Sequence, residues 1–148
     1  MSDSVKMLVD AARAATVNAH APYSGFGVGA ALLLADGQII TGTNFENASY
    51  GLTLCAETVA IATANSMGRL RDIRAIAIIG GKLDNGVING DSAIYPCGRC
   101  RQVINEAAEM GGGEIPVHCA SADGAIVETH MSDDLLPFAF GPKDLGLA

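Results

Sequence analysis

Three cysteines and one glutamate are the residues whose types and spacing best suit a chemical role. Cys97 and Cys100 lie in a Pro-Cys-Gly-Arg-Cys run, and Cys55 lies two residues before Glu57. Both segments open expected helices, where unpaired backbone N–H groups and the helix dipole favour thiolates. Alone, the Cys-x-x-Cys pair also fits a redox dithiol or half of a structural zinc site. The added Cys-Ala-Glu segment favours a metal centre with a carboxylate beside it.

The number of cysteines separates two kinds of zinc site. A catalytic zinc ion keeps three protein ligands and leaves a fourth position to water, whereas a structural ion fills all four. Cys55, Cys97 and Cys100 supply three. Cys119 lies on an apolar run and is expected to pack as a small hydrophobe, although as a fourth ligand it would complete a structural site. Zinc lowers the pKa of bound water towards about 7, so Glu57 is the predicted general acid and base, unless it only complements the helix dipole.

Helices and strands that would position these residues follow from the hydrophobic pattern. We expect a helix ending near residue 19, strands at 27–34 and 38–43 around an Asp-Gly turn, a helix at 55–67, a strand at 73–79, a helix at 97–110, and strands at 116–121 and 125–129. The Gly-, Asn- and Asp-rich segment 80–93 is expected to be a loop. Strands joined through helices predict an α/β fold in which a mixed five-stranded sheet carries helices on both faces. No linker or repeat divides residues 1–148, so we expect one domain.

Composition and charge exclude several classes of function. The 148 residues include 16 acidic and 9 basic ones, a net charge of −7 that argues against a nucleic-acid binder. The longest apolar stretch, 28–35, is far shorter than the roughly 18 residues of a membrane span. Because no basic and apolar leader opens the sequence, we expect a cytoplasmic protein. Its four cysteines would form two disulfides only in an oxidising compartment.

Six sequence segments together resemble the small homotetrameric cytidine deaminases, over about residues 21–145. In the family's order they are Pro-Tyr-Ser-Gly-Phe at 22–26, Val-Gly-Ala-Ala at 28–31, Asn-Phe-Glu-Asn-Ala-Ser-Tyr-Gly at 44–51, Cys-Ala-Glu at 55–57, Pro-Cys-Gly-Arg-Cys-Arg-Gln-Val at 96–103 and Leu-Leu-Pro-Phe-Ala-Phe at 135–140. Cys-x-Glu followed by Pro-Cys-x-x-Cys is a zinc deaminase signature. The resemblance implies a three-layer cytidine deaminase fold, one Zn²⁺ per subunit, and hydrolysis of cytidine and deoxycytidine to uridine and deoxyuridine with release of ammonia.

The resemblance also implies which residues contact the substrate. Asn44 and Glu46 would hold the ribose, and Phe26 would pack on the pyrimidine. The Ala56 backbone and the Glu57 carboxylate would recognise the carbonyl and ring nitrogen of the base. A carboxylate accepts a hydrogen bond from a sugar hydroxyl and repels phosphate, which favours a free nucleoside as substrate. The alternatives are a turn with a solvated acid for Asn44 and Glu46, and a core position for Phe26.

Two aromatic residues carry the expectation of an oligomer. Tyr50 and Phe140 match family positions that reach into the sites of neighbouring subunits. The resemblance therefore implies a homotetramer with active sites shared between subunits.

The sequence departs from the family pattern beside the catalytic glutamate. The family commonly has an arginine there that hydrogen-bonds the zinc thiolates, but this chain has Thr58. Three thiolates on Zn²⁺ leave the cluster near −1, so we expect compensation from helix N-termini or from Arg99 or Arg101. Phe45 and the long 80–93 segment are further departures.

Two other functions remain open from the sequence. Blasticidin S deaminase also has Cys-Ala-Glu without a following arginine and the same Pro-Cys-Gly-Arg-Cys-Arg-Gln-Val run, so this chain would then act on modified cytidines or on that antibiotic. The alternative from another class is a non-catalytic binding module stabilised by zinc, with Cys119 as the fourth ligand.

Overall fold

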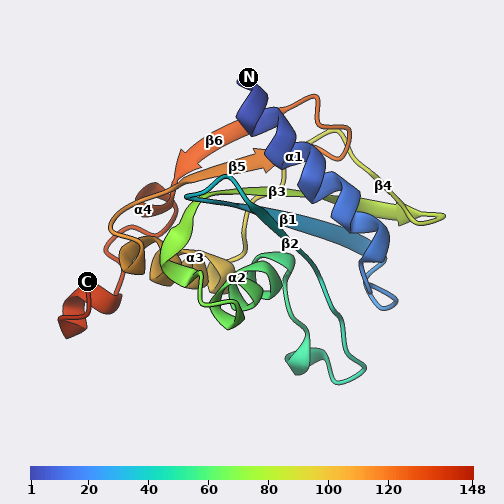
Figure 1. Cartoon of the computed structure of the whole chain (residues 1–148). Coiled ribbons are helices and arrows are strands. Elements are labelled where there is room, and N and C mark those ends of the chain that lie inside the picture. Colours follow the sequence, from blue (N-terminus) through green and yellow to red (C-terminus); the bar gives the residue numbers. More distant parts are fainter.

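Helices cover both faces of a mixed β-sheet in the computed structural model, which describes residues 1–148 (Figure 1). The elements are α1 (Asp3–Ala15), β1 (Phe26–Leu34), β2 (Ile39–Thr43), α2 (Ala56–Ser66), β3 (Ile73–Asp84), β4 (Val87–Asn89), α3 (Gly98–Met110), β5 (Pro116–Ala120), β6 (Val127–Met131) and α4 (Ser132–Leu135). The strand order is β2-β1-β3-β5-β6, and β4 pairs only with β3. Only the β3–β5 pair is parallel. The expected α/β fold with a mixed sheet is confirmed.

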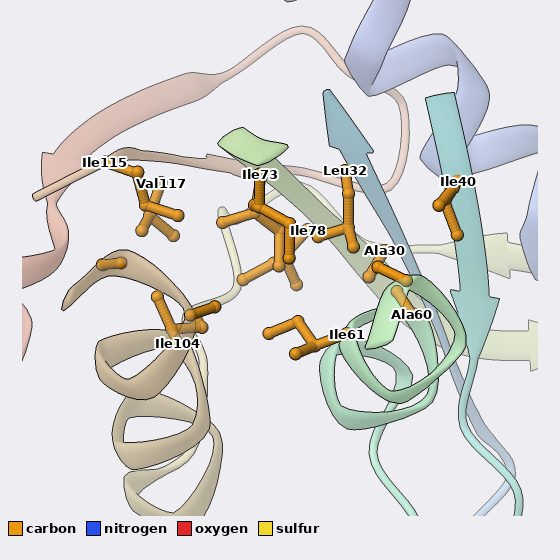
Figure 2. Packing of buried hydrophobic residues seen from close by; sticks show 14 of the residues in the cluster. Ala30, Leu32, Ile40, Ala60, Ile61, Ile73, Ile78, Ile104, Ile115 and Val117 are labelled. Carbon is orange, nitrogen blue, oxygen red and sulfur yellow. The ribbon is translucent and has the colours of Figure 1, made fainter. Parts of the chain in front are cut away.

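The two faces of the sheet bury separate apolar clusters because successive residues of a strand point to opposite sides. On one face, Leu8, Val9 and Ala12 of α1 pack against residues such as Ala31 of β1. On the opposite face, α2 and α3 cover the larger cluster. Figure 2 shows Ile61 of α2 and Ile104 of α3 directed at the sheet residues of that cluster. Helix α1 therefore lies alone on its face, while α2 and α3 share the other.

The prediction of a loop at 80–93 is wrong, because a β-hairpin occupies much of this segment. Strand β3 continues to Asp84, and β4 returns beside it with Leu83 opposite Ile88. Asn85 and Gly86 form the turn with φ of 50° and 80°. Asn-Gly is a strong hairpin signal that the composition of the segment obscured. The sheet therefore has six strands rather than five.

The other predicted strands and helices differ from the structure mainly at their ends. The hairpin turn at Asp36 and Gly37 is confirmed, with Leu33 opposite Ile39. Strand β6 begins two residues later than expected, at Val127. No helix is both long and apolar enough to cross a membrane.

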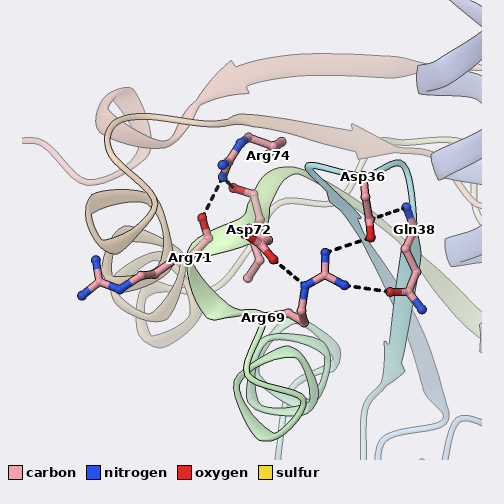
Figure 3. Close-up of polar contacts among 7 residues, drawn as sticks. Asp36, Gln38, Arg69, Arg71, Asp72 and Arg74 are labelled. Carbon is pink, nitrogen blue, oxygen red and sulfur yellow. Dashed lines mark hydrogen bonds and ion pairs between the residues drawn. The ribbon is translucent and has the colours of Figure 1, made fainter.

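Arg69 joins the end of α2 to the turn between β1 and β2 (Figure 3). Its guanidinium Nη2 lies 3.0 Å from Asp36 Oδ2, and Nη1 donates to Gln38 Oε1 at 3.1 Å. Its Nε also donates to Asp72, just before β3. These bonds tie α2 to the sheet at the C-terminal end of β1, whereas Phe26 lies at the N-terminal end of that strand.

Gly42 lets helix α2 lie directly on strand β2. A Cβ at this position would lie 2.6 Å from both the Ala56 carbonyl oxygen and the Ala60 nitrogen. We expect Gly42→Ala to lower the free energy of unfolding by about 1–3 kcal/mol, because backbone atoms cannot rotate away from the added methyl. Urea unfolding measures the change. Gly51→Ala is the control because its Cβ meets nothing within 4 Å, and equal stability of the two variants would contradict the packing argument.

Candidate metal centre and adjoining cavity

Two helix starts bring three cysteine sulfurs together. Cys55 is the N-cap residue of α2 and Cys97 is the N-cap residue of α3, while Cys100 lies one turn into α3. The three Sγ atoms all lie within 4.8 Å of one another, and Cys55 Sγ lies 3.8 Å from Cys97 Sγ. With Zn–S bonds of about 2.3 Å and tetrahedral angles, two ligating sulfurs lie about 3.8 Å apart. The donor set and its spacing therefore fit Zn²⁺.

Cys119 does not belong to this cluster. It is fully buried on β5, and burial raises the pKa of its thiol to about 12. A thiol held in its neutral form among apolar side chains is a poor metal ligand. The sulfurs that converge are therefore three, the number that leaves a zinc coordination position open to water.

The cysteine cluster favours a negative charge even before a cation binds. The pKa of Cys55 is lowered to about 6, mainly by a hydrogen bond from the Cys100 thiol, and further by a hydrogen bond with Cys97 and by the positive charge of Arg99. The same interaction raises the pKa of Cys100. A lowered thiol pKa favours the thiolate form, which is the form that binds a divalent cation.

Glu57 lies against the sulfurs in the first turn of α2. Its side chain is buried, and its Oε2 accepts a hydrogen bond from the Cys100 thiol at 3.5 Å. Burial raises the pKa of the Glu57 carboxyl above its usual range. A carboxyl group that holds its proton more tightly than usual, beside an activated water, is suited to proton transfer in both directions.

Thr58 and two arginines differ in their relation to the cluster. The Thr58 hydroxyl oxygen lies 3.7 Å from Cys100 Sγ. Arg101 donates instead to the backbone carbonyls of Pro96 and Leu135, at 2.9 and 3.2 Å. Arg99 is exposed and donates to a loop carbonyl at 3.4 Å. Of these three residues, Thr58 is the one with a polar contact to a cluster sulfur, and the arginines act on the cluster through their charge.

A cavity of about 450 Å³ opens beside the cysteine cluster, within the range of small-molecule sites. Cys55, Cys97 and Glu57 line one part of it. Of the residues expected to contact a substrate, those in its wall are Phe26, Asn44, Glu46 and Ala56. The cavity therefore adjoins two of the three cysteines and the buried carboxyl, and most of the expected contact residues surround it.

Asn44 and Glu46 fix the backbone around the cavity. The Asn44 amide accepts from the Val28 N–H at 2.9 Å and donates to the Phe26 carbonyl at 2.8 Å. Glu46 Oε1 accepts from the backbone N–H groups of Tyr23 and Ser24, at 2.9 and 3.1 Å. Hydrogen bonds, first of all from the Ser24 side chain, lower the pKa of Glu46. An ionised carboxylate and an amide thus lie in the same wall, both held in place by backbone.

Tyr50 and Phe140 do not line the cavity of their own chain. Tyr50 is 72% exposed and borders a separate hollow of about 340 Å³ with Tyr23 and Glu46. Phe140 is 65% exposed, and its carbonyl accepts from Gln102 of α3 at 2.7 Å. Neither residue is part of the lining of the cavity that the other residues form.

Tyr95 is a cavity residue that the sequence motifs did not single out. It lines the wall next to Ile94, two residues before Cys97. Its position directly before the Pro-Cys-x-x-Cys run was the available signal, because chain that leads into a metal ligand must pass close to the metal.

Comparisons with known proteins agree with this geometry. Residues 2–111 match the family model of the cytidine and deoxycytidylate deaminase zinc-binding region. A cytidine deaminase of Halalkalibacterium halodurans is 44% identical over 140 residues, which cover 95% of this chain and 96% of the relative. A cytidine deaminase from Mycobacterium tuberculosis is 42% identical over 139 residues, which cover 94% of this chain and 91% of the relative. The crystal structure of cytidine deaminase from Burkholderia pseudomallei superposes with a TM-score of 0.79 at 40% identity, covering 95% of this chain and 100% of the other.

Proposed function

This chain belongs to the cytidine and deoxycytidylate deaminase family, and we propose that it hydrolyses cytidine and deoxycytidine to uridine and deoxyuridine. The observation that carries the proposal is the meeting of three cysteine sulfurs and the buried Glu57 carboxyl beside one cavity. In the reaction the oxygen of water bonds to C4 of the base, the bond from C4 to the exocyclic nitrogen breaks, and ammonia leaves. No electrons are transferred.

Cys55, Cys97 and Cys100 hold one Zn²⁺ per subunit in this proposal. The fit rests on the spacing of the sulfurs and on the ease with which Cys55 ionises. When bound there, zinc supplies a Lewis acid that lowers the pKa of water towards about 7. The Thr58 hydroxyl donates to the Cys100 sulfur and so withdraws part of its negative charge.

Glu57 moves the protons. Its carboxylate takes a proton from the attacking water and delivers it to the ring nitrogen of the base, and then carries the proton of the new C4 hydroxyl to the departing amine as the C4 carbonyl forms. Burial, which raises the pKa of Glu57, lets the carboxyl keep that proton between the two transfers. The Ala56 N–H is free to donate to the carbonyl of the base, because the first N–H groups of a helix have no partner within the helix.

Phe26, Asn44 and Glu46 hold the rest of the nucleoside. The Phe26 ring packs on the pyrimidine, and Asn44 with Glu46 binds the ribose hydroxyls. Because Glu46 is ionised, it accepts from hydroxyl groups and repels a phosphate in the same place. An unphosphorylated nucleoside is therefore the preferred substrate.

The zinc-loaded protein is tested on cytidine, deoxycytidine, CMP, cytosine and blasticidin S, with loss of absorbance as the measurement. We expect turnover of the first two and little or none of CMP. Turnover of blasticidin S alone would favour the alternative of an antibiotic deaminase. No turnover of any compound by zinc-loaded protein would reject the proposal in favour of a binding module.

Assembly and location complete the proposal, which takes residues 1–148 as one domain. The exposed rings of Tyr50 and Phe140 reach the cavities of neighbouring copies in a homotetramer with shared sites. The setting is the cytoplasm, where cysteines stay reduced and available to zinc, and neither nucleic acid nor membrane is a partner. Light scattering should give a tetramer, and Phe140→Ala should lose most activity. A fully active monomer would contradict shared sites.

A further inference from the structure

Residues 94–96 form an irregular stretch of chain that is nevertheless fixed at both ends. The Ile94 N–H donates to the Ala120 carbonyl of β5 at 3.3 Å. The Pro96 carbonyl accepts from Arg101 Nε of α3 at 2.9 Å. This segment, here called the 94–96 wall, therefore has the sheet on one side and α3 on the other, although it belongs to no regular element.

Between these two bonds, the Tyr95 side chain is fixed by strand β6. Its hydroxyl donates to Glu128 Oε2 at 2.7 Å. The His130 ring meets the Tyr95 ring edge-on with centroids 5.8 Å apart, and His130 Nε2 lies 3.4 Å from the same Glu128 oxygen. A hydrogen bond to a carboxylate is about twice as strong as one between neutral groups. The ring is thus held in place, although Tyr95 is 45% exposed.

The place of the 94–96 wall determines which part of a substrate it meets. Ile94, Tyr95 and Cys97 line the same cavity, so the wall lies at the end that holds the sulfurs. Asn44 and Glu46, which hold the ribose in the proposed function, come from a different segment of the lining, the chain that follows β2. The carbon that loses its amine must approach the sulfur cluster, and the 94–96 wall leads directly into Cys97 of that cluster.

We propose that Tyr95 is a specificity-determining residue that excludes substituents on the exocyclic amine of the base. The inference rests on the proposed function and narrows it to cytidines with an unsubstituted amine. Hydrolysis of N4-methylcytidine would form the same bond from water to C4 and release methylamine in place of ammonia. Its methyl group needs space that the anchored ring fills, and one such group changes kcat/KM by about 10-fold to 200-fold.

The test is the ratio of kcat/KM for N4-methylcytidine to that for cytidine. We expect Tyr95→Ser to raise this ratio at least tenfold over the wild-type value. Tyr95→Phe keeps the ring and loses its bond to Glu128, so we expect a smaller rise of several-fold. Tyr23→Ser is the matched control. Tyr23 is 49% exposed, a fraction similar to that of Tyr95, but it lines the neighbouring hollow and not the cavity. Its ratio should stay at the wild-type value.

A change of ratio separates this role from a merely structural one, because general damage lowers kcat/KM for both substrates together. An unchanged ratio in Tyr95→Ser would overturn the inference. If Tyr95→Ser loses zinc or unfolds, Tyr95→Phe decides, and an unchanged ratio there overturns it as well. Cytidine turnover by the wild type keeps the two hypotheses apart. If the wild type does not turn over cytidine, the proposed function is rejected. If it does, and the ratio of kcat/KM values in Tyr95→Ser is unchanged, only the role of Tyr95 is rejected.

Discussion

Glu57→Gln is expected to lower kcat for cytidine by about 10²–10⁴-fold while one zinc ion per subunit remains bound. Glutamine matches the shape of glutamate but cannot take a proton from water and return it to the base. Glu57 is buried beside the Cys100 sulfur, and this burial raises the pKa of the Glu57 carboxyl. Turnover by absorbance and metal content by elemental analysis measure the two effects separately.

Glu106→Gln is the matched control for this experiment. Glu106 is an exposed glutamate on α3, so the same chemical change there should leave both kcat and zinc content near wild type. Full activity of Glu57→Gln would remove the proton-transfer role. Loss of zinc together with activity would instead make Glu57 part of the metal-binding set, which also contradicts the proposal.

Cys97→Ser should have the second large effect, on metal binding. Loss of an outer-shell partner lowers metal affinity by about 10–100-fold, and loss of a thiolate ligand should cost more than that. Zinc content after dialysis against a chelator measures the change, and activity should fall in parallel. Because the cluster joins the starts of α2 and α3, the variant should also be less stable than zinc-loaded wild type.

Cys119→Ala tests whether the fourth cysteine is a ligand. Cys119 is buried on β5 and outside the group of three sulfurs, so the variant should retain its zinc. Its cost should be confined to stability, about 1 kcal/mol for the lost packing of one sulfur. If Cys119→Ala lost zinc as Cys97→Ser does, the site would have four thiolate ligands and would be structural.

Local patterns predicted the elements well where one interaction dominates. Helix α1 begins where Ser2 accepts from the Val5 N–H, and the Asp-Gly turn forms the first hairpin. The second hairpin was missed because its glycines and asparagines are also typical of loops. Pairing with β1 decided its structure, since Phe26 at the start of β1 lies opposite Lys82 of the extended β3.

The sequence by itself determined the kinds of group in the site. Cys55 and Cys97 precede helices whose free N–H groups favour thiolates, and Glu57 follows within one turn, all of which are local properties of the chain. The tertiary structure alone decided that sulfurs 42 residues apart lie 3.8 Å from each other. That distance depends on how α2 and α3 pack on one face of the sheet.

The same packing decided which residues lie around the cavity. It leaves Cys119 out of the cluster, brings Tyr95 into the wall, and leaves Tyr50 and Phe140 outside the lining of their own chain's cavity. The sequence already predicted that Cys119 packs as a small hydrophobe, and the family resemblance implied that Tyr50 and Phe140 serve neighbouring sites. The place of Tyr95 in the cavity wall depends on contacts between segments far apart in the sequence. Residue chemistry therefore predicted a metal centre with a neighbouring carboxylate, and the family resemblance implied its reaction. Only the packing of distant segments decided which side chains surround the site.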